Sequence, residues 1–159
     1  MIETEYDVVV AGYGPVGETC ANLLGYYGIK ALILDKEKNA YPLPRAITWD
    51  AECQRAMSHC EFLSEVKTRK IRGVDNKDAK KRSIMKITTE GFDTYNYQHR
   101  ILFIHQPQFD EAHRENAEKY STNTIKTGSE LLAVDEINGV IDCTYKNIDT
   151  NEQFTVTSK

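Results

Sequence analysis

Residues 6–17 read YDVVVAGYGPVG and decide the fold, because a short β-branched run ends there at a cluster of glycines. The run at 6–11 suits a strand buried on both faces in a parallel sheet, and we expect it to be the first and central strand. The glycines follow at the spacing G-x-G-x-x-G, and a proline stands among them where the first turn of a helix tolerates it. The stretch therefore predicts a strand, a glycine loop and a helix that begins in the loop.

A glycine loop between a strand and a helix can hold a pyrophosphate, because no side chain blocks the approach of phosphate oxygens to the backbone. Gly12 permits the sharp turn out of the strand, Gly14 lets the main chain approach the phosphates, and Gly17 lets the helix pack against the sheet. Pro15 and Val16 complete the loop, and the helix N-terminus offers unpaired N–H groups to an anion. The alternative is a structural turn without a ligand.

The context of the glycines favours a dinucleotide site. A helix is predicted over residues 15–27 and a second strand over 29–35, and Asp35 ends that strand. An acid in this place can accept hydrogen bonds from ribose hydroxyls, and it disfavours a 2′-phosphorylated adenosine. The loop alone does not distinguish FAD from NAD.

Composition narrows the class of protein. The 159 residues are enough for one domain, and 40% hydrophobic with 28% charged residues is typical of a soluble globular protein. The net charge of −4 disfavours nucleic acid and anionic lipid as partners, and the basic stretch at 67–86 has no aromatic platform for bases. Because no apolar run approaches the length of a membrane span and the chain opens with acidic residues, we expect a cytoplasmic protein without a membrane partner.

Cysteines and histidines predict neither disulfides nor a metal site. Cys53, Met57 and Cys60 recur at helical spacing, and no C-x-x-C pair occurs, so buried reduced thiols are expected. The four histidines include no pair at the i, i+4 spacing that would place two ligands on one helical turn.

The remaining pattern predicts two helices and several short strands. One helix is expected at about 50–66, with Asp50 as its cap, and another at 107–120, with few leucines on its inward face. Asn138 and Gly139 predict a two-residue hairpin turn. Strands are expected at about 83–89, 100–105, 123–127, 130–136, 140–147 and 153–157. We therefore expect an α/β fold in which a Rossmann-like parallel sheet is followed by a C-terminal antiparallel β-meander.

Three stretches carry a resemblance to a known family. Residues 6–37, the loop YPLPRA at 41–46 with the nearby WDAE at 49–52, and HQP at 105–107 resemble the N-terminal part of single-component FAD-dependent aromatic hydroxylases. The branch they resemble is the hydroxyphenylpropionate and phenol hydroxylase type. The resemblance implies an FAD-binding domain over residues 1–159, with 67–105 inserted toward the substrate-domain side. For the parent protein it implies hydroxylation of a phenolic substrate with NADH or NADPH as reductant.

The resemblance also implies roles for single residues. Asp35 would bind the adenosine ribose and Lys36 would lie beside the adenosine. Arg45 would reach the phosphate and ribose region, Gln106 would contact the extended part of FAD, and the backbone at Leu131 would touch adenine. From the residues alone, Arg45 could instead be an exposed cation and Gln106 a helix cap. Trp49 either covers the cofactor or fills the core.

The chain departs from this family because its later Asp-Gly and Gly-Asp motifs are absent. We therefore expect an incomplete FAD-binding domain, a fragment of a larger hydroxylase, in which no catalytic residue can be named. An open parallel sheet also exposes an edge, which predicts self-association unless another chain covers it. Two alternatives are a stand-alone, non-catalytic nucleotide-binding module and an NAD-dependent dehydrogenase domain.

Overall fold

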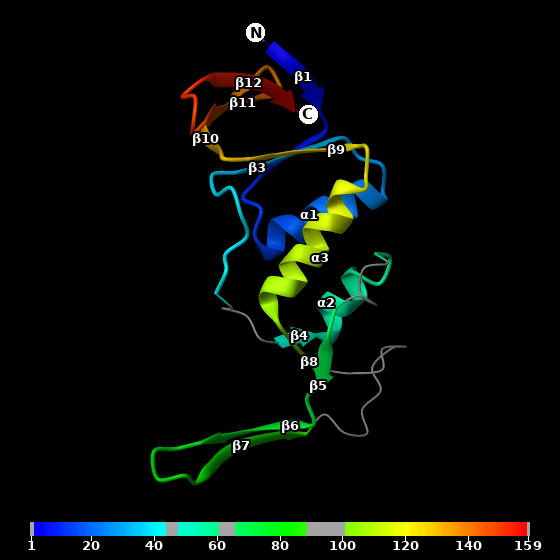
Figure 1. The fold of residues 1–159 in the computed structure, drawn as a ribbon, viewed down its shortest axis with the longest axis vertical. Coiled ribbons are helices and arrows are strands. Elements are labelled where there is room, and N and C mark those ends of the chain that lie inside the picture. The colour runs from blue at the N-terminus through cyan, green and yellow to red at the C-terminus, as the bar shows by residue number, and fades with distance from the viewer. Residues whose placement is uncertain (1, 44–47, 61–65, 89–100, 159) are drawn as a thin grey trace.

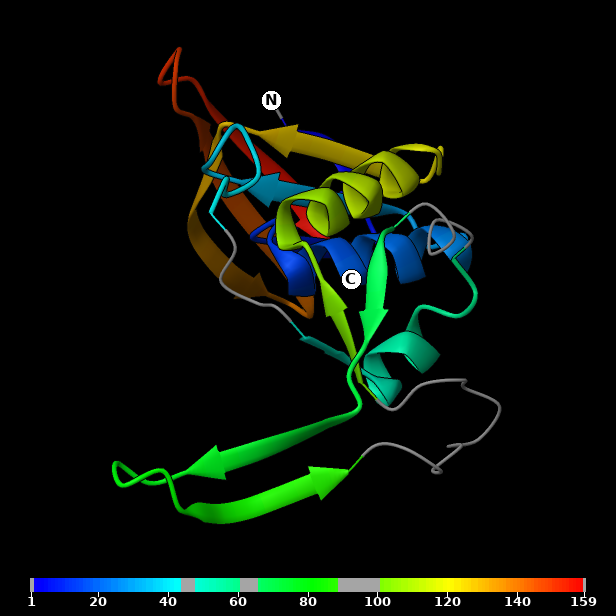
Figure 2. The same cartoon turned by 60° about the horizontal axis from the view of Figure 1, so that its bottom comes forward.

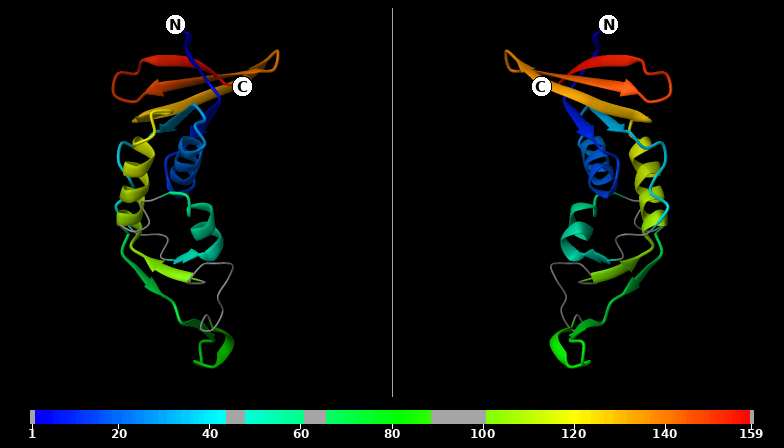
Figure 3. Two further views of the ribbon diagram at one scale, coloured as in Figure 1. Left: turned by 90° about the vertical axis from the view of Figure 1, so that its right-hand side faces the viewer. Right: turned by 90° about the vertical axis from the view of Figure 1, so that its left-hand side faces the viewer.

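The computed structural model describes residues 2–43, 48–60, 66–88 and 101–158. Its main body has three layers, a mostly antiparallel sheet, a parallel sheet and a pair of helices, which Figures 1 and 3 show from three sides. A smaller sheet with a short helix lies at the far end of the helices, and a hairpin extends beyond it (Figure 1).

The parallel sheet contains β2 (Val8–Ala11), β3 (Ala31–Asp35) and β9 (Asn123–Thr127), in the order β2-β3-β9. Helix α1 (Pro15–Tyr26) connects β2 to β3, and α3 (Gln106–Glu118) precedes β9. Both helices lie side by side on one face of this sheet (Figure 1). The predicted strand–loop–helix–strand unit is thus present, and it supplies two of the three strands of this sheet and one of the two helices.

The mostly antiparallel sheet covers the opposite face. It has the order β1-β12-β11-β10 and is built from β1 (Ile2–Tyr6), β10 (Ser129–Ile137), β11 (Val140–Asn147) and β12 (Gln153–Ser158). Strands β10, β11 and β12 form the predicted meander, while β1 pairs parallel to β12. Asn138 and Gly139 both have positive φ angles, 55° and 78°, as their predicted hairpin turn requires.

Alternate residues of β3 serve the two faces of the sheet, because side chains along a strand point to opposite sides. Leu32 and Leu34 pack toward the meander, in a buried cluster with Tyr6, Cys143, Tyr145 and Val156. Ala31 and Ile33 pack toward the helices, in a buried cluster with Tyr13, Ala21 and Ala117. The fold is therefore a parallel sheet between two covering layers.

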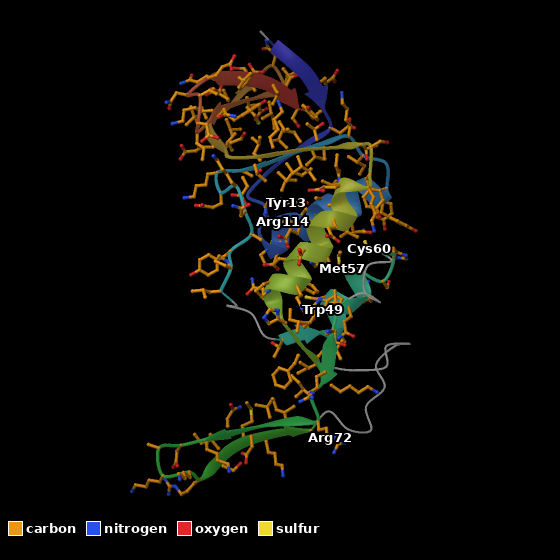
Figure 4. The ribbon with its side chains drawn as sticks, in the orientation of Figure 1. Tyr13, Trp49, Met57, Cys60, Arg72 and Arg114 are labelled. Atoms are coloured by element: carbon orange, nitrogen blue, oxygen red, sulfur yellow. The ribbon has the colours of Figure 1, made fainter. Side chains whose placement is uncertain are left out.

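A third core joins the N-terminal end of α3 to the small sheet β4-β8-β5 and to the region of helix α2 (Ala51–Ala56). The strands are β4 (Thr48–Asp50), β5 (Thr68–Lys70) and β8 (Ile101–Ile104). Trp49 packs here, with its ring edge-on to Phe109 at 5.0 Å, and Figure 4 labels it near Met57 and Cys60. This placement favours the core role for Trp49.

The hairpin of β6 (Gly73–Lys77) and β7 (Ser83–Thr88) projects away from all three cores (Figure 2). Every residue of both strands is exposed. The hairpin and strands β5 and β8 belong to the 67–105 segment, and its orientation toward a substrate domain remains a prediction.

Two expectations about the first strand are wrong. Residues 6–11 do not form one strand, because Tyr6 ends β1 in the antiparallel sheet and Val8 begins β2. The central strand is β3, while β2 pairs with no second strand among the described residues. This edge position leaves Val8, Val9 and Val10 only half-buried, whereas β3 is buried along nearly its whole length. The self-association that the exposed edge predicts is still a prediction.

The helix expected at 50–66 is also too long. Asp50 caps α2 as predicted and accepts a hydrogen bond from the Cys53 N–H at 2.8 Å, but the helix ends at Ala56. Met57 and Cys60 are buried, and they lie in the turn that follows the helix. Cys53, inside the helix, is exposed. The helical spacing of the three residues therefore did not mark one buried face. All four cysteines are free thiols.

The described residues contain no helix that is both long and apolar enough to cross a membrane. They also contain no group of three or more His, Cys, Asp or Glu side chains arranged to hold a metal ion.

Candidate functional site

The glycine loop (residues 12–17) joins β2 to α1 as a tight turn. Gly12 adopts a φ of +102°, and its N–H donates to the carbonyl of Leu34 at 2.7 Å. A Cβ on Gly17 would lie 1.9 Å from the carbonyl oxygen of Gly12, so only glycine lets the helix pack this closely against the loop. A Cβ on Gly14 would meet no protein atom within 4 Å. The loop thus keeps free space beside Gly14.

The N-terminus of α1 is not capped by a side chain. Gly14 is the N-cap, with φ −92° and no side-chain hydrogen bond, and Pro15 follows in the first turn. The first N–H groups of a helix have no partner within the helix and carry a partial positive charge. This end of α1 therefore offers donors to an anion.

Asp35 closes the loop onto the end of β3. Its Oδ2 accepts from the Tyr13 N–H at 2.8 Å, and its Oδ1 accepts from the Glu37 N–H at 2.9 Å. Each carboxylate oxygen has a second lone pair, so both can still accept a ribose hydroxyl.

A cleft of about 1250 Å³ opens along this side of the loop. It brings together five of the sequence-predicted site residues, namely Gly14, Pro15, Asp35, Lys36 and Gln106. Asp110 and Arg114 from α3 line the same cleft. Residues that are far apart in the sequence therefore share one cavity, next to the uncapped helix end.

The other predicted residues lie elsewhere. Gly12, Val16 and Gly17 line a smaller hollow of about 280 Å³ with Cys20 on the β2 side of α1. Leu131 lines neither cavity, and its side chain packs against the core between the two large sheets. Arg45 lies outside the described residues.

Gln106 is the first residue of α3 and is buried, with 5% of its surface exposed. The helix cap is His105, not Gln106, and the Gln106 amide donates to Asp110 Oδ2 at 3.2 Å. The amide is thus held at the cleft wall by a residue one turn further along the helix.

A buried ion pair under the loop was not expected from the sequence. Glu18, in the first turn of α1, is fully buried, and its Oε1 accepts from Arg114 Nε at 2.7 Å. Arg114 also donates through Nη2 to the Tyr13 carbonyl, and its guanidinium carbon lies 4.5 Å from the centre of the Tyr13 ring. Figure 4 shows Arg114 and Tyr13 side by side at the start of α1. The pair connects both helices to the loop.

Further polar side chains fill the contact between the two helices. Asn22 donates to the backbone carbonyls of Glu18 and His113, and its Oδ1 accepts from Asn116 at 2.6 Å. Burial lowers the pKa of His113 to about 4 and raises the pKa of Asp110. The inward face of α3, predicted to be poor in leucine, therefore packs against α1 through side-chain hydrogen bonds as well as through Ala117.

One sequence signal could have located this polar layer. Glu18 and Asn22 stand four residues apart, as do Asp110 and Arg114, so each pair shares one helical face. The glycines of α1 predict where the helix packs against the loop, and they do not indicate that its polar positions are buried.

Burial makes the stability contribution of Glu18 depend on pH. Desolvation, partly offset by Arg114, raises the pKa of Glu18 from 4.5 to about 7. The folded protein then binds a proton more tightly than the unfolded chain does, so this contribution is present at low pH and is lost as the pH rises through the folded pKa. The other groups that face Glu18 or its partner Arg114 are Asp110, His113, Asp35 and Tyr13.

From about pH 5 to pH 8 we expect the parent to lose roughly 2–3 kcal/mol of unfolding free energy through Glu18, a loss that the Glu18→Gln variant does not share. Urea unfolding of both proteins at the two pH values measures this change. Because His113 and Asp110 are present in both proteins, the difference between the two proteins reports the Glu18 carboxyl together with its coupling to these neighbours. A difference that stays constant with pH would contradict the raised pKa.

Comparisons with known proteins identify an FAD-binding domain, in agreement with the glycine loop and the cleft beside it. A family model described as FAD binding domain matches residues 5–159. A 3-(3-hydroxy-phenyl)propionate/3-hydroxycinnamic acid hydroxylase of Comamonas testosteroni is 27% identical over 95% of this chain and 26% of its own length. A para-nitrophenol 4-monooxygenase of a Pseudomonas species is 36% identical over 44% of this chain. The chain spans about a quarter of the length of the first relative.

The fold is also that of a solved enzyme. The crystal structure of p-nitrophenol 4-monooxygenase from Pseudomonas putida matches 99% of this chain and 40% of its own, with a TM-score of 0.82 and 20% identity. The expected α/β class, with a parallel sheet and a meander, is thereby confirmed, and so is the resemblance to aromatic hydroxylases.

Proposed function

The chain belongs to the FAD binding domain family, and on this premise we propose that it binds FAD in the cleft beside the glycine loop. The observation that carries the proposal is the position of Asp35, Lys36 and Gln106 in one cleft with the uncapped start of α1. A dinucleotide needs these donors and acceptors together, and the three elements that supply them, α1, β3 and α3, all contribute to this cleft.

The residues fit the chemical groups of FAD. Helix N–H groups and the space beside Gly14 suit the pyrophosphate, and the Asp35 carboxylate suits the adenosine ribose. Lys36 would lie beside the adenosine, and the Gln106 amide would hold the extended part of the cofactor. Arg45 and the backbone of Leu131 complete the proposed set. When bound, FAD supplies the redox chemistry that protein side chains lack.

For the whole protein we propose an NADH- or NADPH-dependent monooxygenase that hydroxylates a small phenolic substrate. The names of the hydroxyphenylpropionate hydroxylase and the nitrophenol monooxygenase support this class of substrate. The four free thiols fit a reducing compartment, so we place the protein in the cytoplasm. This chain's part in that activity is to bind and orient FAD.

FAD titration tests the proposal. We expect the purified protein to bind FAD, with quenching of flavin fluorescence, and to prefer it to NAD. Binding of NAD with indifference to FAD would favour the dehydrogenase alternative. Turnover of NADH stimulated by a phenol would exclude a non-catalytic module.

Gln106→Leu should lower the affinity for FAD about tenfold and leave the affinity for ADP unchanged. The reason is that the amide is proposed to contact the part of FAD beyond the adenosine diphosphate. Isothermal titration with FAD and with ADP measures both affinities. The matched control is Gln108→Leu, an exposed position on the same helix. An equal loss for FAD and ADP would remove Gln106 from the proposed role.

A further inference from the structure

Charged side chains hold the backbone of Tyr13 at both of its polar groups. The Tyr13 N–H donates to Asp35 Oδ2 at 2.8 Å, and the Tyr13 carbonyl accepts from Arg114 Nη2. These two side-chain atoms are themselves 4.0 Å apart. The acid at the end of β3 and the arginine of α3 thus clamp one residue of the glycine loop between them.

Arg114 is fixed in turn by the buried acid of α1. Its Nε donates to Glu18 Oε1 at 2.7 Å, and Glu18 has no exposed surface. The Arg114 side chain retains 15% exposure, toward the cleft that it lines. The guanidinium therefore connects a buried anchor to the wall of the cleft.

Stability alone is a poor explanation for this arrangement. Replacing a buried ion pair by apolar side chains of similar volume is often neutral or stabilising, because removing two charges from water is costly. The neighbouring core between sheet and helices is apolar, with Ala21, Ile33 and Ala117. An apolar pair would fill the same space, so the location of the charges under the loop is the informative feature.

We propose that Arg114, anchored by Glu18, is a positioning residue that holds the loop and Asp35 in the geometry that FAD requires. The inference rests on the proposed function and extends it to two residues. A peptide group is planar and trans, so its carbonyl and its N–H point in opposite directions. By fixing the Tyr13 carbonyl, Arg114 also fixes the direction of the Gly14 N–H, at the position where the loop leaves space for the pyrophosphate.

The first test separates positioning from stability. Arg114→Met leaves Glu18 buried without its partner and can unfold the protein, so the decisive variant is the double change Glu18→Leu with Arg114→Met. We expect the double variant to be at least as stable as the parent and to bind FAD about tenfold more weakly. The single variant Arg114→Lys should bind FAD more tightly than the double variant but more weakly than the parent, because a lysine ammonium lacks the planar fork of guanidinium.

The control is Arg82→Met. Arg82 forms an equally short pair, 2.7 Å to Asp78, in the hairpin that projects away from the main body (Figure 2), and neither residue lines the cleft. It should leave FAD affinity unchanged. FAD affinity of the double variant within about twofold of the parent would overturn the inference, because about 0.4 kcal/mol is too small for a lost positioning contact.

The second test needs no cofactor. Amide hydrogen exchange of the free protein, followed by NMR, should show the Tyr13 N–H exchanging at least about tenfold faster in the double variant. The Gly12 N–H, bonded to Leu34 at 2.7 Å, should keep its rate. Equal rates for Tyr13 in both proteins would refute the clamp. If the parent bound no FAD, the proposed function would fail, and the exchange rates would still decide whether Arg114 positions the loop.

Discussion

Gly17→Ala will lower the free energy of unfolding by about 3 kcal/mol, the largest change in stability that we expect from one methyl group in this protein. The new Cβ would lie 1.9 Å from the Gly12 carbonyl oxygen and 2.9 Å from its carbonyl carbon. Both contacts are with backbone, so no side-chain rotation can relieve them. Either α1 must move away from the loop or the loop must change its conformation, and the higher helix propensity of alanine offsets only about 1 kcal/mol.

Urea unfolding, followed by far-UV circular dichroism, measures this loss. For a chain of this length the expected change corresponds to a fall in Tm of roughly 6–12 °C. Since the loop must deform, FAD binding should be lost as well. A variant as stable as the parent would mean that α1 does not pack against the loop as the structure shows.

Gly14→Ala should instead abolish most FAD binding and leave the fold intact. A Cβ on Gly14 meets no protein atom within 4 Å, and the backbone has a negative φ that alanine adopts readily. The methyl group would occupy the space that the proposed pyrophosphate needs. A steric cost of about 3 kcal/mol corresponds to a loss of affinity of about 100-fold.

FAD titration and urea unfolding of the same preparation measure the two effects together. Stability should change by less than about 1 kcal/mol, the cost of a poorer helix cap. The two glycine variants control for each other, because each adds one methyl group to the same loop. If Gly14→Ala bound FAD as tightly as the parent, the pyrophosphate would not lie beside Gly14.

The region beneath the loop combines residues whose place the sequence predicts with residues whose place it does not. The glycine spacing and Asp35 predicted the loop, and the cleft indeed lies beside them. Glu18 and Arg114 are separated by almost a hundred residues, and the i, i+4 spacing around each one does not indicate that the two residues pair with each other. They meet because α1 and α3 pack on the same face of the parallel sheet.

Strand order was likewise beyond the local pattern. The β-branched run at 8–10 predicted a strand, and β2 is one. Strand β3 pairs with β2 on one side and with β9 on the other, so β3 is central and β2 lies at the edge. The sequence of β2 alone does not contain this information. The same limit applies to Cys53, which shares the spacing of Met57 and Cys60 but is exposed, whereas the other two are buried in the turn after α2.

The sequence by itself determined the βαβ unit, the hairpin turn at Asn138 and Gly139, and the order of the meander strands. These depend on backbone preferences and on apolar periodicity, which neighbouring residues carry. Only the tertiary structure decided that Gln106, Asp35 and Arg114 line one cleft and that Glu18 is buried beneath the loop. Burial and charge pairing depend on which elements pack together, and that packing brings residues from distant parts of the chain into contact.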